Sequence, residues 1–365
     1  MSTGVDLMQP VTFSIFEEME WGSGKDLQDH YDSVMQTARL ADSLHGYSGI
    51  YFGEHHFTKL SANASQGVFI SYASAVTSRI RIGALVYVTP IRNPVLLSEE
   101  ICVLDHLTHG RLDIGFGSGI SDLELKRYNI NGEFAKKASK ECNEIMLRYF
   151  ASNGQPFSWS GEVYKFDLVD PVILPLQRPH PPIWIPTRNL NTIDWVASMG
   201  YNTAWGLDSD DVLKRAFERY RNTYLAHHRG ENRKNFPTLA LQRVVLVADS
   251  DRKARELAGP ALKSWVDNLL EISKREGGAN TYKSRINTGF NVPDFDSLRD
   301  IDAAFKKGLI FVGSPETVAE MISKSIQYTG ANGIMCKFSF GDLEREDIFN
   351  SMELFSREVI PRISA

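Results

Sequence analysis

This 365-residue sequence has little cysteine, no long apolar stretch and no run of basic residues. Its three cysteines, Cys102, Cys142 and Cys336, are widely spaced and odd in number, which argues against a disulfide framework or a zinc knuckle. The apolar stretches are far shorter than the roughly 20 residues of a membrane-spanning helix. A formal net charge of −5, without a lysine or arginine run, gives no electrostatic basis for binding nucleic acid.

The N-terminal residues also lack the charged start and the apolar segment of a signal peptide. We therefore expect a cytoplasmic protein with reduced thiols that binds neither a membrane nor nucleic acid. Hydrophobic residues make up 42% of the sequence and charged residues 23%. This balance is typical of a globular protein with enough apolar side chains for a large core.

Strand-like runs alternate with amphipathic helical stretches along the chain. The helical stretch from about Asp26 has apolar residues at spacings of three and four, and another has Asn93 as its cap and Pro94 in its first turn. Eight runs are the expected strands: residues 11–16, 49–52, 80–89, 111–117, 181–187, 201–206, 239–248 and 333–340.

Strands that alternate with helices predict parallel pairing and α/β architecture. Eight strand–helix pairs without a domain break favour a single (β/α)8 TIM barrel over residues 1–365, rather than a doubly wound sheet. The chain is longer than a minimal barrel of roughly 250 residues. We therefore expect insertions, and residues 151–182 and 273–300 are the best candidates.

The catalytic residues of such a barrel lie at the C-terminal ends of its strands. This rule selects the segments that follow the expected strands: residues 54–57, 87–90, 117–120, 186–192, 205 and 337–340.

One of these segments, Glu54-His55-His56, carries an acid and two adjacent histidines. Neighbouring residues of an extended segment point to opposite faces, so the two imidazoles are poorly placed to bind one metal ion, and the spacing is not that of the helical His-Glu-x-x-His zinc motif. We therefore expect no metal. An acid–base role for one histidine suits the near-neutral pKa of imidazole. A purely structural role for both is the alternative.

Two other segments have features of ligand sites. Gly115, Gly117 and Gly119 form G-x-G-x-G rather than the dinucleotide motif G-x-G-x-x-G, so they indicate either a close approach of the backbone to a ligand or a tight turn. Arg188 follows the fifth expected strand, and Asn189, Asn191 and Thr192 lead into a helix. An arginine beside exposed helix-start amides suits a phosphate group, although either asparagine could also serve only as a helix cap.

Taken in order, four segments resemble the bacterial luciferase-like flavin monooxygenases, with a layout closest to the luciferase α-subunit. They are EHHF at residues 54–57, then residues 80–119, which include LDHLTHGR, then PPIWIPTRNLNTIDWVASMG at residues 181–200, and finally residues 313–338. The resemblance extends from Val11 to Ile363. It implies a (β/α)8 barrel that binds reduced FMN from a separate NAD(P)H:flavin reductase and activates O2 as a flavin C4a-peroxide. It also implies a hydrophobic organic substrate and a homodimer.

The resemblance assigns roles to individual residues. His55 takes the position of the catalytic histidine, and Glu54 and His56 support it. Leu85-Val86 takes the position of a segment that meets the flavin ring and carries a non-proline cis peptide bond in relatives. The remaining cofactor contacts implied by the resemblance are Gly117, Ser118 and Gly119, a basic position at Lys136 or Lys137, and Arg188, Asn189 and Thr192.

The sequence departs from luciferase at the phosphate site, where Ser118 replaces an arginine and Gly117 a reactive cysteine. We hypothesise that Arg188 compensates for Ser118. The expected walls of the substrate pocket are Phe16, Phe57, Tyr87, Thr89, Trp205 and Phe338. Residues 273–300 match a mobile loop that closes over the flavin in the family, and an insertion without consequence is the alternative.

Two other functions are compatible with the same segments. A deazaflavin-dependent oxidoreductase is one, since relatives with this barrel use that cofactor and have small residues at the Ser118 position. A non-catalytic partner subunit is the other, although such a subunit typically lacks the first histidine and the long loop.

Overall fold

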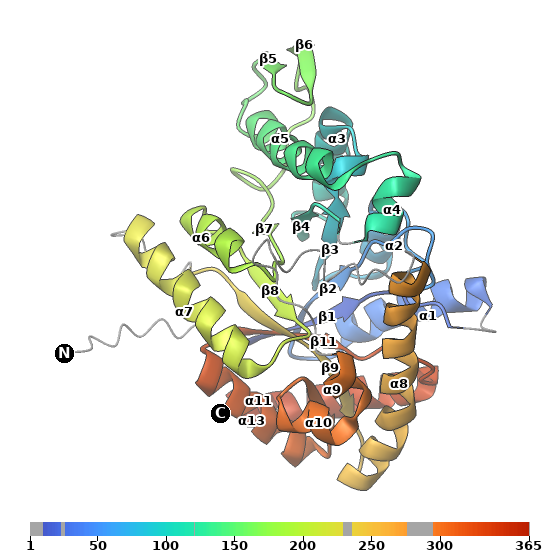
Figure 1. Ribbon diagram of the computed structural model, residues 1–365. Coiled ribbons are helices and arrows are strands. Elements are labelled where there is room, and N and C mark those ends of the chain that lie inside the picture. Colours follow the sequence, from blue (N-terminus) through green and yellow to red (C-terminus); the bar gives the residue numbers. More distant parts are fainter. Residues whose placement is uncertain (1–9, 23–25, 120, 229–235, 276–294, 365) are drawn as a thin grey trace.

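Parallel strands form a ring at the centre of the protein, and Figure 1 shows these strands with helices around them. The structure is a computed structural model, and it describes residues 10–22, 26–119, 121–228, 236–275 and 295–364. The ring contains β1 (Thr12–Glu17), β2 (Tyr47–Phe52), β3 (Arg81–Val88), β4 (Leu112–Gly117), β7 (Ile183–Trp184), β8 (Thr203–Gly206), β9 (Leu239–Val247) and β11 (Gly333–Lys337).

The pairing of these strands confirms the predicted barrel. In one direction β1 is followed by β2, β3, β4 and β7, and in the other by β11, β9 and β8, all in parallel. A parallel bridge between Trp184 and Asn202, the residue before β8, closes the ring. All eight expected strands overlap an observed strand of this ring.

One strand of the main sheet, β10 (Ile310–Gly313), was not expected from the sequence. It pairs with residues 244–247 of β9, beyond residues 239–242, which pair with β8. The apolar run of β10 has only four residues, which is too short to be distinguished from the start of the helix that follows it.

Helices surround the ring (Figure 1). Two begin where the sequence indicated: Asn93 is the expected cap of a helix that has Pro94 in its first turn, and Asp26, near the expected start of another helix, accepts hydrogen bonds from the N–H groups of Gln28 and Asp29. The helices are α1 (Leu27–Ser43), α2 (Gln66–Val76), α3 (Pro94–Leu107), α4 (Asp122–Arg127), α5 (Gly132–Phe150), α6 (Leu190–Ser198), α7 (Asp210–His227), α8 (Asp251–Arg275), α9 (Phe295–Arg299), α10 (Ile301–Lys306), α11 (Pro315–Thr329), α12 (Arg345–Leu354) and α13 (Ile360–Ser364), with a 3-10 turn at Thr89–Ile91 and a π-helical turn at Phe355–Val359.

The structure describes the first expected insertion completely and the second only at its two ends. Residues 151–182 contain an antiparallel hairpin of β5 (Phe157–Ser160) and β6 (Lys165–Val169), which stands beside α5 away from the ring (Figure 1). Of the expected mobile loop, residues 276–294 lie outside the described residues, and its flanks belong to the end of α8 and to α9. None of the helices in the described ranges combines the length and the apolar character needed to cross a bilayer.

Apolar side chains fill the ring and the layer between the ring and the helices. Because side chains alternate along each strand, one set points inward and the other toward the helices. The apolar side chains of the inward set form a cluster separate from the main core: Phe16, Tyr51, Leu85, Trp184, Ala204, Ala240 and Met335. These side chains fill the inside of the barrel, so a ligand cavity is expected at the C-terminal ends of the strands.

Candidate active site

A cavity of about 810 Å³ lies where the C-terminal ends of β2, β3, β4, β7 and β8 meet. This volume is within the range of roughly 300–1,000 Å³ for small-molecule sites. The structure brings twelve of the sequence-predicted site residues to its wall: Phe16, Glu54, His55, Leu85, Val86, Gly117, Ser118, Gly119, Lys136, Arg188, Asn189 and Thr192.

His55 has a fixed partner in the cavity wall. Its Nδ1 lies 2.9 Å from Oε1 of Glu124, a buried residue of α4. Ser121 caps α4 by accepting a hydrogen bond from the Glu124 N–H, so the short helix holds the carboxylate in place. Burial lowers the pKa of His55, but the hydrogen bond and the charge of Glu124, with smaller contributions from Glu18 and Glu54, outweigh it and raise the pKa above its ordinary value.

Glu54 and His56 belong to a second network, which lies behind His55. Oε1 of Glu54 is 2.9 Å from Nε2 of His56 and 2.8 Å from Nη2 of Arg92, and the hydroxyl of Tyr128 is 3.0 Å from Nδ1 of His56. Both ring nitrogens of His56 are therefore engaged with protein side chains. This arrangement separates the two histidines, since His55 lines the cavity and His56 is buried beside it.

The backbone of β3 and β4 shapes one wall of the cavity. The Leu85–Val86 peptide bond is cis, which confirms the expectation from the resemblance. A Cβ atom at Gly117 would lie 2.5 Å from Cγ2 of Val86, and one at Gly115 would lie 2.3 Å from the carbonyl oxygen of Ala84. Both distances are shorter than a van der Waals contact, so glycines are required for β4 to lie this close to β3.

Another part of the cavity wall carries polar and basic groups. Arg188 follows β7, and its Nη2 lies 2.8 Å from Oδ2 of Asp208. Asn189 caps α6 by accepting a hydrogen bond from the N–H of Asn191, so Thr192 lies in the first turn of this helix. Lys136 is an exposed residue of α5. These groups could bind an anion, because the start of α6 presents backbone N–H groups next to a guanidinium.

Seven predicted residues lie outside the lining of the cavity. His56 belongs to the network described above. Lys137 pairs with Glu162 at 2.8 Å, and Phe57 is 53% exposed and contacts the rings of His56 and Tyr128. The other four, Tyr87, Thr89, Trp205 and Phe338, are buried.

The side chains of these four residues pack in the core or bond other protein groups, and they do not line the cavity. Tyr87 and Phe338 pack in the main core, because their side chains point toward the helices. The hydroxyl of Thr89 donates to the carbonyl of Gly117, and the indole of Trp205 donates to Asp208. The prediction of pocket walls used only the nearness of a residue to a strand end, which does not determine the direction in which its side chain points.

Sequence reasoning missed Glu124 and Asp208. Both lie in loops or short helices after strands, and their partners, His55 and Arg188, are 69 and 20 residues away. The sequence signal nearest to Glu124 is Ser121 three positions earlier, which has the spacing of a capping box. That motif predicts a helix start and does not reveal which side chain its glutamate meets.

A buried charged cluster lies beside the cavity at the ends of β1 and β11. Nζ of Lys337 is 2.6 Å from Oε2 of Glu18, which also accepts a hydrogen bond from the indole of Trp265. Glu20 accepts hydrogen bonds from Asn268 of α8 and from the N–H of Gly341. Burial raises the pKa of Glu17 to about 7, and the charge of Lys337 offsets it only in part. This cluster attaches α8 to the barrel.

No group of three or more histidine, cysteine, aspartate or glutamate side chains is arranged to hold a metal ion among the described residues. The three cysteines are buried and free.

Comparison with known proteins identifies the family of this chain. Residues 8–333 match the model of the luciferase-like monooxygenases. The chain is 27% identical over 278 residues to the oxygenase component of flavin-dependent trigonelline monooxygenase from Acinetobacter baylyi, covering 72% of this chain and 74% of that one. It is 23% identical to an alkanal monooxygenase alpha chain from Photorhabdus luminescens, covering 97% and 94%.

Two solved structures share the fold. The oxygenating constituent of 3,6-diketocamphane monooxygenase from Pseudomonas putida, in complex with FMN, has a TM-score of 0.79 with 21% identity, covering 97% of this chain and 99% of that one. The coenzyme F420-dependent tetrahydromethanopterin reductase from Methanopyrus kandleri has a TM-score of 0.71 with 18% identity, covering 97% and 100%. On the family match, the chain belongs to the luciferase-like monooxygenases and is an enzyme of that class.

Proposed function

We propose that the protein is the oxygenase component of a cytoplasmic two-component system, which uses reduced FMN and O2 to oxygenate a hydrophobic organic substrate. The observation that carries this proposal is the His55–Glu124 pair in the wall of a largely apolar cavity. The relatives support it, because trigonelline monooxygenase is named as an oxygenase component and the 3,6-diketocamphane enzyme contains FMN. An NAD(P)H:flavin reductase would be its partner.

The residues of the cavity fit a flavin mononucleotide. Gly117 lies close to the side chain of Val86, and both line the cavity, where they would contact the flavin ring. Arg188, the cap residue Asn189 and Thr192 in the first turn of α6, with Ser118 directly after β4, offer donors for a phosphate. Lys136 would add a positive charge at the same cavity. Bound reduced FMN would supply the electrons that activate O2.

The protein would exclude water from the cavity and transfer a proton during the reaction. The apolar side chains of Phe16, Val88, Phe116 and Ile185 line the cavity and would exclude water from it. His55 would hold or transfer a proton through Nε2, because its Nδ1 is engaged by Glu124. Glu54 and His56 would keep His55 in place through the loop that all three share. The apolar walls match a hydrophobic substrate.

Cofactor titration tests this proposal. Trp195 lines the cavity, so ligand binding should quench tryptophan fluorescence. We expect saturable binding of reduced FMN under anaerobic conditions and, when a flavin reductase and NAD(P)H are supplied, incorporation of ¹⁸O from ¹⁸O2 into a straight-chain alkanal or a cyclic ketone as probe substrate. Riboflavin, which lacks the phosphate, is the control and should bind more weakly. Saturable binding of coenzyme F420 without binding of FMN would contradict the proposal.

A deazaflavin-dependent oxidoreductase is the second candidate. It is favoured by the small residue Ser118 in place of an arginine and by the fold shared with the F420-dependent reductase. The same titration separates the two candidates. A non-catalytic partner subunit is disfavoured, since His55 and its partner Glu124 are both present in the cavity wall.

We also propose a homodimer formed through α2, α3 and the adjacent loop. Val68 and Tyr72 of α2 and Leu96, Val103 and Leu107 of α3 are all exposed. The loop packs against α3 through the hydrogen bond between His106 and the carbonyl of Leu174, and it adds exposed Val172, Ile173 and Leu176. A cluster of apolar residues on one face is typical of an oligomer interface.

Sedimentation velocity tests the dimer. Val103→Glu is expected to convert a wild-type dimer into a monomer, because an interface core does not accommodate an unpaired charge. Met199→Glu changes an exposed apolar residue of comparable exposure at the end of α6, outside the cluster, and should leave the dimer intact. A monomeric wild type would exclude this interface.

A further inference from the structure

We propose that Asp208 is a specificity-determining residue that weakens the binding of the FMN phosphate by neutralising Arg188. The inference rests on the proposed function, in which the cavity binds FMN. A cofactor that a reductase delivers has to enter and leave in every turnover. A site that binds its phosphate with moderate rather than maximal strength allows this exchange.

Arg188 and Asp208 form an ion pair that is mostly shielded from solvent. Nη2 of Arg188 lies 2.8 Å from Oδ2 of Asp208, and the two side chains are 10% and 4% exposed. The same oxygen accepts a hydrogen bond of 2.6 Å from the indole of Trp205, which is itself buried. Trp205 therefore fixes the carboxylate on the side of the guanidinium, and the pair has no net charge when both groups are ionised.

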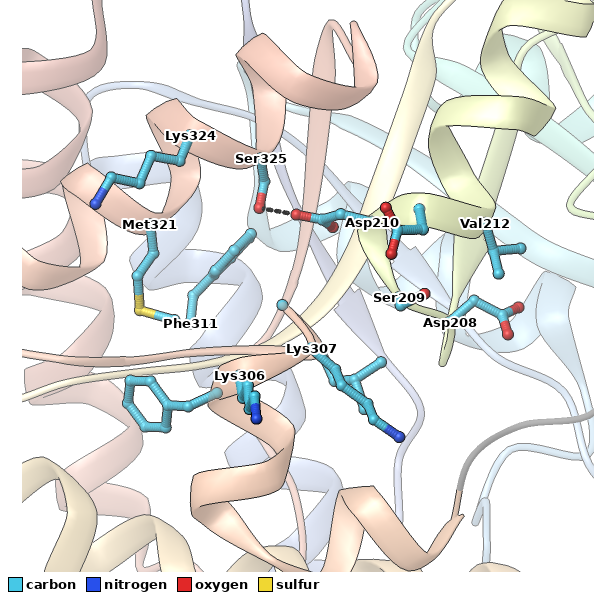
Figure 2. A pocket seen from close by; sticks show the side chains of 14 residues that line it. Asp208, Ser209, Asp210, Val212, Lys306, Lys307, Phe311, Met321, Lys324 and Ser325 are labelled. Atoms are coloured by element: carbon cyan, nitrogen blue, oxygen red, sulfur yellow. Dashed lines mark hydrogen bonds between the residues drawn. The ribbon is translucent and has the colours of Figure 1, made fainter.

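Asp208 lies at the boundary between two cavities. Arg188, Gly206 and Leu207 line the ligand cavity. Asp208 lines a second cavity of about 610 Å³ between the start of α7, α10 and α11. Figure 2 shows its carboxylate at the edge of this second cavity, followed by Ser209 and Asp210 at the start of α7. The short segment 207–209 thus separates the two cavities and carries the acid that pairs with Arg188.

Electrostatics gives the direction of the effect. A phosphate that approaches Arg188 meets both the attraction of the guanidinium and the repulsion of Asp208, and in a partly buried site neither charge is strongly screened by water. Removing the carboxylate charge leaves a buried guanidinium without its counter-ion, for which a phosphate is the best replacement. Asp208→Asn should therefore tighten FMN binding by roughly tenfold, as expected for removal of a like charge next to a ligand charge.

The chain offers a matched control in Asp210. This acid also pairs with a buried arginine, Arg243, at 2.8 Å, and it accepts a hydrogen bond from Ser325 (Figure 2). It lines the second cavity and not the ligand cavity. Asp210→Asn removes the same charge two residues away and should leave FMN affinity unchanged.

The test measures dissociation constants of FMN and riboflavin by isothermal titration calorimetry for the wild type, Asp208→Asn, Asp210→Asn, Arg188→Met and the Arg188→Met/Asp208→Asn double variant. We expect Asp208→Asn to tighten FMN but not riboflavin, and this gain to disappear in the Arg188→Met background. If Asp208→Asn does not fold, Asp208→Ser carries the same expectation.

The possible failures are distinct. A wild type that binds neither FMN nor riboflavin would overturn the proposed function together with this inference. A wild type that binds both, with FMN affinity unchanged in Asp208→Asn or with FMN and riboflavin tightened equally, would overturn only the role of Asp208.

Discussion

His55→Gln is expected to lower kcat by about 10²–10⁴-fold, the range for loss of a positioned general acid or base. The amide keeps a polar side chain in the cavity wall but cannot transfer a proton near neutral pH. Oxygenation of a straight-chain alkanal or a cyclic ketone, with a flavin reductase supplying reduced FMN, measures the effect. Binding of reduced FMN should change far less than kcat, because His55 would act on the reaction rather than on the phosphate.

His227→Gln provides the control for a histidine change, since His227 is an exposed residue of α7 outside the cavity, with its Nδ1 2.9 Å from the carbonyl oxygen of Thr223 in the same helix. It should retain wild-type kcat. Equal kcat values for the wild type and His55→Gln would exclude a role for His55 in proton transfer.

Glu124→Gln tests the partner of His55 through pH dependence. The hydrogen bond and charge of Glu124 raise the pKa of His55 above its ordinary value, against the effect of burial. Loss of the charge lowers that pKa, so the limb of the pH–rate profile that reports His55 should move to lower pH. This direction is the same whether the histidine acts as an acid or as a base. A purely structural role of Glu124 would lower activity without moving the limb.

The largest expected effect on stability comes from Lys337→Met. Lys337 is the cation beside Glu18 and lowers the pKa values of Glu17 and Glu20. Removing one partner of a buried ion pair typically costs about 3–5 kcal/mol, because the remaining charge is left uncompensated. We expect a loss of this size in the free energy of unfolding, measured by urea denaturation at pH 8.

The loss should be smaller at pH 5 than at pH 8. The pKa of Glu17 is raised to about 7 from an ordinary value of 4.5, so between these values the folded protein binds more protons than the unfolded chain. Stability then falls as pH rises through this window, and it should fall further in Lys337→Met, where no cation offsets the acids. Lys324→Met, which removes an exposed lysine paired with Glu320, should cost less than about 1 kcal/mol. An equal loss at both pH values would contradict this explanation.

The sequence predicted the barrel because strand and helix patterns are local. The residue patterns of 11–16 and 333–340 indicate strands regardless of which strands they pair with. Helix caps such as Asn93 lie within a few residues of the N–H groups that they bind. The cis bond at Leu85–Val86 and the cavity position of His55 followed from resemblance to the family. Nothing in the local pattern separates His55 from His56.

The missed features depend on contacts between distant segments. Glu124 meets His55, and Asp208 meets Arg188, only because the ring brings the ends of different strands together. Trp205 and Phe338 are near strand ends but point away from the cavity, and a single residue of register decides this orientation. The acid cluster around Lys337 was missed for a related reason, since it joins β1, β11 and α8 across more than 300 residues.

The closure of the ring at β7 has a mechanical consequence. β7 has two residues, pairs with β4 at two positions and meets β8 through the single bridge at Asn202, whereas β3 and β4 pair at five positions. The strand pairing of the barrel is therefore weakest at β7. Arg188 and the start of α6 follow directly after β7, whereas His55 follows β2 and the cis bond lies in β3. A ligand that contacts both groups of residues would therefore stabilise the barrel where its strand pairing is weakest.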